Sequence, residues 1–174
     1  MADENGKAPA NGKDAGAAGG EQPNVQILGQ YVRDLSFENP RAPESLSGQG
    51  ENPKMQIEVN VNAKKVGEDA YESSIDFNAK ATADTGTLYE LELVYSGLSK
   101  LENVPDNMLQ PILLINCPTL IFPFLRRLVA DITREGGFPP LMLDPIDFGT
   151  LYAQNMKKKQ DDVMKQVAAE PPES

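Results

Sequence analysis

The sequence predicts an α+β fold in which a four-stranded antiparallel, Greek-key-like sheet carries two main helices on one side. Three segments between residues 55 and 95 alternate apolar and polar residues and are joined by short turns, as strands with one buried face do. A β-rich segment precedes them at 25–37, and from Pro105 onward the apolar period becomes helical. The 174 residues suffice for one domain with tails.

The first predicted strand, 25–37, is joined to the others by a long connection. The segment 38–53 contains three prolines and two glycines and is longer than a hairpin needs, so we expect a crossing loop. One face of the strand is expected to carry Val25, Ile27, Tyr31, Arg33, Leu35 and Phe37. The other face is expected to carry Gln26, Gln30, Asp34 and Ser36, interrupted by Leu28 and Val32.

The next three predicted strands form an antiparallel meander that is apolar on its inner side and polar on its outer side. The turn at 84–86 joins the last two of these strands. The residues expected to face inward are Met55, Ile57, Val59, Val61, Tyr71, Ser73, Ile75, Phe77, Ala79, Tyr89, Leu91, Leu93 and Tyr95.

A long apolar helix is expected over 118–137. Pro123 kinks it or marks its first turn, and the pair Gly136 and Gly137 ends it. The preceding segment, 106–116, has Asp106 as a possible N-cap. Its Pro111 is tolerated only near a first turn or at a break.

An extended linker rich in proline and apolar residues follows at 138–148. Asp144 is expected to cap a final helix that runs from Ile146 to about Met164, with Asp147 in its first turn.

The two ends of the chain differ from its middle in composition. Residues 1–24 are rich in Gly, Ala, Asn and Asp and lack an apolar period, so we predict a disordered tail. Residues 25–155 form the predicted domain, and 156–174 the end of the last helix and a flexible tail. We find no secretory signal and no apolar run long enough to cross a bilayer.

Charge and residue usage argue against several function classes. The formal net charge of -10 repels a phosphate backbone, so nucleic acid is not an expected partner. The chain has no histidine, the usual general base and commonest metal ligand, and Cys117 lies in an apolar stretch without an assignable base. We therefore expect no catalysis, metal or cofactor, a buried structural thiol, and a cytoplasmic protein.

The helical part of the sequence carries more apolar surface than one sheet face is expected to bury. The surplus suggests burial between subunits, a binding groove, or both. The helix stripe with Leu120, Phe124 and Leu128 is the candidate subunit interface. The linker residues Leu141, Met142, Leu143, Ile146 and Phe148 are the candidate groove, although a linker that simply packs between two helices explains them equally well.

Acidic residues gather on the predicted outer side of the sheet. Glu58, Glu72, Asp76, Glu90 and Glu92 lie there, with Asp34 and Glu38 on or beside the first strand. A solvated surface explains them, and so does a docking surface for a basic partner.

Three motifs in order, YVRDLSFENPRAP (31–43), TLYELELVYSGL (87–98) and CPTLIFPFLRRLVADITREGGFPPLMLDPIDFGTLY (117–152), resemble the SecB-type protein-export chaperones. The resemblance covers roughly residues 25–155. It implies a sheet with helices on one side and a homotetramer built as a dimer of dimers. It also implies a holding chaperone that uses no nucleotide or metal, binds unfolded secretory precursors and delivers them to the SecA motor ATPase.

The resemblance also assigns roles to residues. It implies that Asp34, Glu38 and Glu92 dock SecA, together with Glu90, which stands where an apolar residue is expected. The implied client groove draws on Ile27, Tyr31, Leu141, Met142, Leu143, Ile146, Phe148 and Tyr152. The family's tail contact to the zinc-binding region of the motor has no clear counterpart in MKKKQDDVMKQ (156–166).

Two alternatives stay open. One is a chaperone of the same fold that serves a single client, such as an antitoxin. The other is a small enzyme that uses the carboxylates of Asp144 and Asp147, whose spacing also fits ordinary helix capping.

Overall fold

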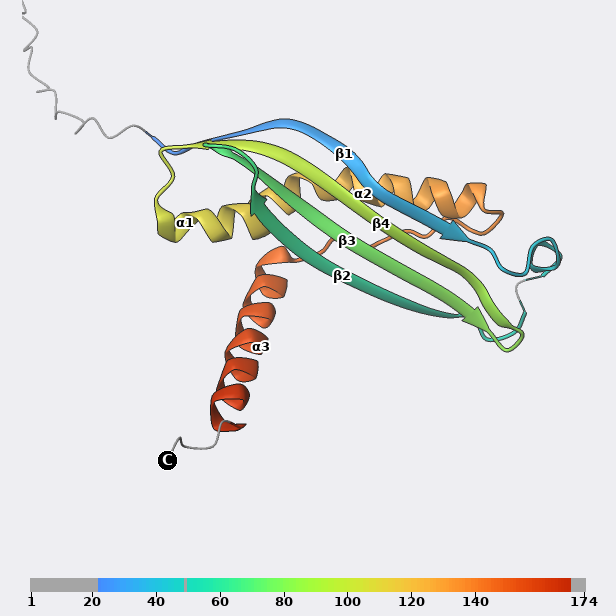
Figure 1. Ribbon diagram of the computed structural model, residues 1–174. Coiled ribbons are helices and arrows are strands. Elements are labelled where there is room, and N and C mark those ends of the chain that lie inside the picture. Colours follow the sequence, from blue (N-terminus) through green and yellow to red (C-terminus); the bar gives the residue numbers. More distant parts are fainter. Residues whose placement is uncertain (1–21, 49, 170–174) are drawn as a thin grey trace, which may run out of the picture.

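The computed structural model describes residues 22–48 and 50–169 and has one four-stranded antiparallel sheet (Figure 1). Its strands are β1 (Asn24–Glu38), β2 (Lys54–Lys65), β3 (Ala70–Ala83) and β4 (Gly86–Glu102), in the spatial order β1-β4-β3-β2. The connection between β1 and β2 contains a short 3₁₀ helix, η1 (Glu44–Leu46). Since β1 returns to lie beside β4, the predicted Greek-key-like α+β sheet is confirmed.

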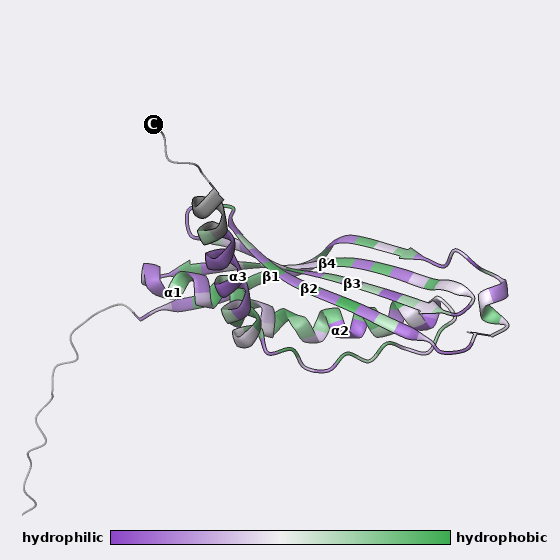
Figure 2. Cartoon of the chain, turned by 90° about the horizontal axis from the view of Figure 1, so that it is seen from below, coloured by the Kyte–Doolittle hydropathy of each residue, from purple (hydrophilic) through white to green (hydrophobic). Residues whose placement is uncertain are grey.

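The helical part covers one face of the sheet. The segments α1 (Asp106–Pro111), η2 (Ile112–Asn116, a π-helix) and α2 (Cys117–Glu135) follow one another without a break, and α2 lies along the sheet (Figure 1). Helix α3 (Phe148–Ala169) starts near η2 and projects away from the sheet. In Figure 2 the strands alternate hydrophilic and hydrophobic residues along their length. We call the face under α2 the helix side and the opposite face the outer side.

The continuity of the segment from α1 to α2 corrects one prediction. Among the described residues, the stretch Asp106–Glu135 is the one helix long and apolar enough to cross a membrane. The sequence separated 106–116 from a long helix over 118–137 and indicated no apolar run of membrane-spanning length. The π-helical turn of η2 and the first-turn position of Pro118 instead join the two segments, and Pro123 lies inside α2. The fully buried Ile121, Leu125 and Val129 pack this helix onto the sheet.

The helix caps are partly as predicted. Asp106 is the first residue of α1 and makes no side-chain cap, because Pro105 holds the N-cap position in an extended conformation. Asp147, rather than Asp144, caps α3: its Oδ1 accepts the Thr150 N–H at 3.0 Å. The glycine end of α2 is confirmed, since Gly137 adopts a positive φ of 86°.

Two bulges in β1 correct the predicted faces of that strand. Ile27 pairs with Ser99 and Gly29 with Leu98, while Val32 pairs with Tyr95 and Asp34 with Val94, so Leu28 and Arg33 are extra residues. Each extra residue shifts the alternation by one position. Ile27 therefore stays on the helix side, but Tyr31 lies on the outer side opposite Ser96. The shared face expected for Ile27, Tyr31 and Arg33 is wrong.

The main core lies between α2 and the two central strands. Its members from the sheet are the predicted inward residues Ile75, Phe77, Ala79, Leu91, Leu93 and Tyr95. Ile121, Leu125 and Val129 fill the helix side of this core with at most 1% of their surface exposed.

Truncation of the central helix residue tests this packing. We expect Leu125→Ala to lower the free energy of unfolding by about 2–5 kcal/mol, because the side chain is fully buried and its truncation leaves a cavity in the core. Urea unfolding followed by circular dichroism measures the loss. Met142→Ala, at a side chain that is 65% exposed, is the matched control and should change stability by less than about 0.5 kcal/mol. Equal losses in the two variants would contradict this core.

Candidate functional site: an acidic sheet face and an apolar pocket

Four predicted acidic residues lie together on the outer side of β1 and β4. Glu38 is directly opposite Glu90, Glu92 is opposite Ser36, and Asp34 follows along β1 opposite Val94. Asp34, Glu38 and Glu92 are exposed, and we call these three residues, together with Glu90, the acidic face. Like charges directly across a strand pair repel each other. Lys80 on β3 forms an ion pair with Glu90 and neutralises part of this charge.

The acidic surface continues over β3 to β2. Glu58 lies opposite Asn78, which in turn lies opposite Glu92. A shallow hollow of about 220 Å³ opens between them and is lined by Gln56, Glu58, Asn78, Ala79, Lys80, Glu90, Leu91 and Glu92. The carboxylates of Glu58 and Glu92 therefore flank Asn78 on the outer side, so acidic residues extend from the acidic face to the edge strand β2.

Glu72 differs from the other outer acids because it is buried, with only 7% of its surface exposed. Burial alone raises its pKa, but hydrogen bonds from Lys64 and Ser96 and the charges of Lys64 and Arg33 outweigh it and hold the pKa below the ordinary value. The solvated or docking position expected for Glu72 is thus not what the structure has.

An apolar pocket opens on the helix side where α2 ends. It has a volume of about 220 Å³ and lies between the start of β2, the adjoining ends of β3 and β4, and the linker after α2. Its lining residues are Pro53, Lys54, Met55, Ala81, Leu88, Tyr89, Phe138, Pro139, Pro140 and Leu141. We call it the linker pocket.

Aromatic rings form the floor of the linker pocket. The Tyr89 ring lies 4.8 Å from that of Phe138 and stacks on Phe37 at 5.6 Å, measured between centroids. Burial raises the pKa of the Tyr89 phenol, which favours its neutral form beside the apolar lining of the pocket. Met55, on the edge strand, is 42% exposed and forms the accessible rim.

Thr133 holds the linker wall of this pocket in place. The Phe138 N–H donates to the Thr133 carbonyl at 3.1 Å, and the Leu141 N–H donates to Thr133 Oγ1 at 2.9 Å. Pro139 and Pro140 between them have no N–H. The wall is therefore tied at both ends to one residue in the last turns of α2.

The predicted groove residues do not share one site. Leu141 lines the linker pocket and Met142 is exposed, but Leu143 and Phe148 are buried in the main core. Ile146 packs against that core.

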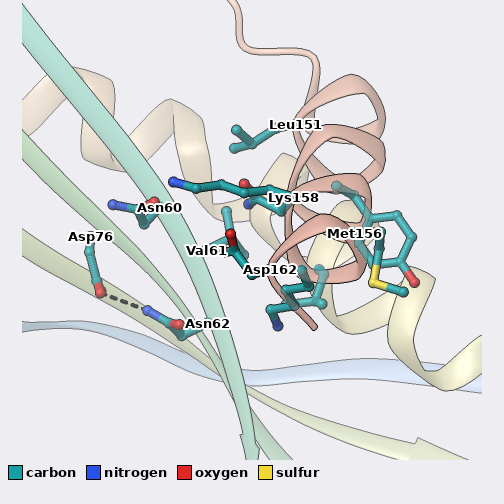
Figure 3. Close-up of a pocket in the computed structure, with 12 residues that line it drawn as sticks. Asn60, Val61, Asn62, Asp76, Leu151, Met156, Lys158 and Asp162 are labelled. Atoms are coloured by element: carbon teal, nitrogen blue, oxygen red, sulfur yellow. Dashed lines mark hydrogen bonds between the residues drawn. The ribbon is translucent and has the colours of Figure 1, made fainter. Parts of the chain in front are cut away.

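The other three predicted groove residues are further apart. Ile27 packs against the cluster around Leu101 and Cys117, and Tyr31 lies on the outer side. Tyr152 lines a separate cleft of about 460 Å³ between β2 and α3, in which Figure 3 shows Val61, Leu151, Met156, Lys158 and Asp162. The pocket residues Met55, Leu88, Tyr89 and Phe138 were missed. Alternation marked Met55 and Tyr89 as inward but cannot tell which inward residues a helix leaves uncovered.

The candidate interface residues on α2 are partly exposed. Leu120 and Phe124 have 55% and 43% of their surface exposed, while Leu128 packs against the main core. A helix of a water-soluble protein rarely exposes two large apolar residues one turn apart without a partner for them.

Neither Cys117 nor Asp147 has the surroundings of a reactive group. Burial raises the pKa of the Cys117 thiol, which lies 3.7 Å from Ser99 Oγ. The hydrogen bonds from the Thr150 N–H and hydroxyl lower the pKa of Asp147 and occupy both its oxygens in the cap of α3.

An acidic sheet face on one side, and an apolar pocket beside a helix with exposed apolar residues on the other, are typical of a protein that binds other polypeptides. The family model described as preprotein translocase subunit SecB matches residues 18–159. The chain is 47% identical over 149 residues to the protein-export protein SecB of Bradyrhizobium sp., covering 86% of this chain and 92% of that relative. It is 49% identical over 147 residues to that of Afipia carboxidovorans, covering 84% and 91%. The chain belongs to the SecB family.

A solved structure has the same fold at much lower identity. The SecB-like chaperone of Mycobacterium tuberculosis, in complex with a peptide from the HigA1 antitoxin, superposes with a TM-score of 0.58 at 16% identity. The match covers 70% of this chain and 90% of that one.

The charge network of Glu72 predicts a pH dependence of stability. Because its pKa is lower in the folded than in the unfolded chain, the network stabilises the fold above the ordinary value of 4.5 and loses this effect as the pH falls through the folded pKa. We expect Glu72→Gln to cost about 1–3 kcal/mol near neutral pH, and the difference from wild type to shrink below pH 4.5. Urea unfolding at a series of pH values measures it, and a difference that is constant with pH would contradict the assignment.

Proposed function

We propose that this protein is an ATP-independent holding chaperone that binds unfolded secretory precursors in the cytoplasm and delivers them to the SecA motor ATPase. Membership of the SecB family supports this function. The observation that carries it in the molecule itself is the separation of an open apolar pocket from an acidic face on opposite sides of one sheet. The protein acts without catalysis, nucleotide, metal or nucleic acid, and does not insert into a membrane.

The client surface centres on the linker pocket and extends along the exposed apolar residues next to it. Met142 beside the pocket is flexible and polarizable and accommodates varied side chains. On edge strand β2, Met55 and Ile57 are 42% and 44% exposed on the same side. Each contact is weak, but many of them along one unfolded chain act together and oppose its folding by mass action.

The acidic face is the docking surface for SecA. Asp34, Glu38, Glu90 and Glu92 lie on two adjacent strands, with the pocket on the other side of the sheet. A basic surface of the motor relieves the repulsion between Glu38 and Glu90 on binding. Client and motor therefore bind at the same time without competing for one surface.

The protein assembles as a homotetramer, a dimer of dimers. Leu120 and Phe124 supply exposed apolar surface on α2, and Leu128 continues the stripe one turn further. Burial of this stripe between subunits explains why a soluble chain with a net charge of -10 carries so apolar a helix.

A second candidate function is a chaperone dedicated to one client. The M. tuberculosis structure with an antitoxin peptide favours it, because the same fold serves such a client there. Identification of the proteins that co-purify with this chain separates the two functions. A broad set of precursors supports general export, and one dominant client supports the dedicated function.

Substitutions on the two surfaces separate the two binding activities. We expect Glu92→Lys to weaken SecA binding about tenfold or more, because it reverses a charge in the acidic face, and to leave client binding unchanged. Met55→Glu should weaken the binding of a denatured secretory precursor about tenfold, because it places a carboxylate on the pocket rim, and leave SecA binding unchanged. Titration calorimetry with purified SecA and fluorescence anisotropy with a labelled precursor measure both constants.

Val66→Glu is the matched control for the pocket, since it places the same new carboxylate on an apolar side chain that is 48% exposed, just beyond the other end of β2 and outside the pocket lining. If Glu92→Lys or Met55→Glu weakens SecA binding and precursor binding equally, the separation of the two surfaces is refuted.

The assembly is tested by mass. We expect light scattering to give roughly 76 kDa, four times the chain mass of 18.9 kDa. Phe124→Asp should shift the mass to a smaller species, because it places a charge in the apolar stripe of α2. A wild-type monomer at micromolar concentration would refute the tetramer.

A further inference from the structure

The buried carboxylate of Glu72 connects all four strands of the sheet. Its Oε1 accepts hydrogen bonds from Arg33 Nη1 on β1 at 3.1 Å and from Ser96 Oγ on β4 at 3.0 Å. Its Oε2 pairs with Lys64 Nζ on β2 at 3.0 Å. The side chain of Glu72 is only 8% exposed, whereas those of Arg33 and Lys64 are about half exposed.

The strand register does not fix the position of the Arg33 side chain. It is the extra residue of the second β1 bulge and has no partner in the β4 register, between Val32 opposite Tyr95 and Asp34 opposite Val94. Regular alternation therefore does not determine the direction of its side chain. The bond to Glu72 determines it.

Arg33 is also a cation next to the acidic face, since the following residue is Asp34; the other cation there, Lys80, is already paired with Glu90. Lys64 lies on the far edge strand, across β3 from β4 and β1. If Glu72 lost its charge, the long side chain of Arg33 would turn to the neighbouring carboxylates, beginning with Asp34, and neutralise part of that face.

We propose that Glu72 is a positioning residue for the acidic face: it holds Arg33 away from Asp34, Glu38, Glu90 and Glu92, so that their charge stays available to a basic partner. This inference rests on the proposed function, in which that partner is SecA. It assigns the buried carboxylate a part in docking, although it lies outside the surface that touches the partner.

A double substitution tests the inference in the full-length protein. Titration calorimetry with purified SecA is carried out on Glu72→Gln, Arg33→Gln and the double variant, at low and moderate salt. We expect Glu72→Gln to weaken SecA binding about fivefold at low salt, as one added positive charge near the face does. The double variant should return to within about twofold of wild type, because the released cation is removed too.

Each outcome decides one question. If Glu72 acts only through the stability of the sheet, the double variant binds SecA as weakly as Glu72→Gln or more weakly, and the inference is overturned. If Glu72→Gln binds like wild type while Glu92→Lys is weakened, the inference fails and the proposed function stands. If Glu92→Lys also binds SecA like wild type, the docking function itself fails. Circular dichroism and precursor binding show that each variant remains folded.

Discussion

The close packing of α2 on the central strands is the interaction on which the rest of the structure depends. At Gly97 on β4 a Cβ atom would lie 3.0 Å from Ile121 Cγ2, so the helix approaches the sheet about as closely as its backbone allows. Ile121, Leu125 and Val129 then exclude water from the centre of one face. Charged residues of the strands therefore lie on the opposite face, because unpaired charges are not tolerated in such a core. The two-sidedness of the molecule follows from this single contact.

The linker pocket follows from where α2 ends. One helix covers the two central strands but leaves the helix side of the edge strands open, where Val32, Leu35, Met55 and Ile57 stay exposed. After Glu135 the positive φ of Gly137 turns the chain back, and Thr133 ties the proline-containing linker over Tyr89. The pocket is thus a stretch of sheet that the helix no longer covers and the linker covers only in part.

The sequence predicted the sheet well where alternation alone determines the structure. The faces of β2, β3 and β4 agree with prediction apart from Leu88, because a polar residue such as Asn60 or Glu90 between apolar neighbours allows only one register. Leu88, expected on the outer face, lies at a register shift and is buried in the cluster with Tyr89 and Phe138. The faces of β1 were predicted only in part: Val25, Ile27, Leu35 and Phe37 share one side as expected, but Tyr31 does not. Leu28 and Val32 interrupt the alternation next to the two bulges, but such an interruption does not by itself show an inserted residue, and only the residues between the two bulges face the other way.

The site was predictable in part for the same reasons. The acidic face combines alternation on β4 with a register to β1 that only the structure shows, as in the pairing of Glu38 with Glu90. The pocket was half predicted: Leu141 belongs to it, but Leu143 two residues later lies in the core. Residues two apart in a regular extended segment face the same way, so packing against the main core, rather than alternation, decides which of these two leucines stays open. Helix capping shows the same limit, since Asp144 and Asp147 both suit a cap and the hydrogen bond to Thr150 selects one.

Salt affects binding at the acidic face and binding in the linker pocket differently. Glu38 opposite Glu90 destabilises the free protein by a few tenths of a kcal/mol to about 1 kcal/mol, a repulsion that any basic partner relieves. Ions in solution screen both the repulsion and its relief, so attraction to the acidic face weakens as salt rises. Contacts in the linker pocket depend on apolar burial by Met55, Tyr89 and Phe138, on which simple salts have little effect. Under the proposed function, a sheet with these two faces retains an unfolded chain on one side while its partner on the other side binds and leaves.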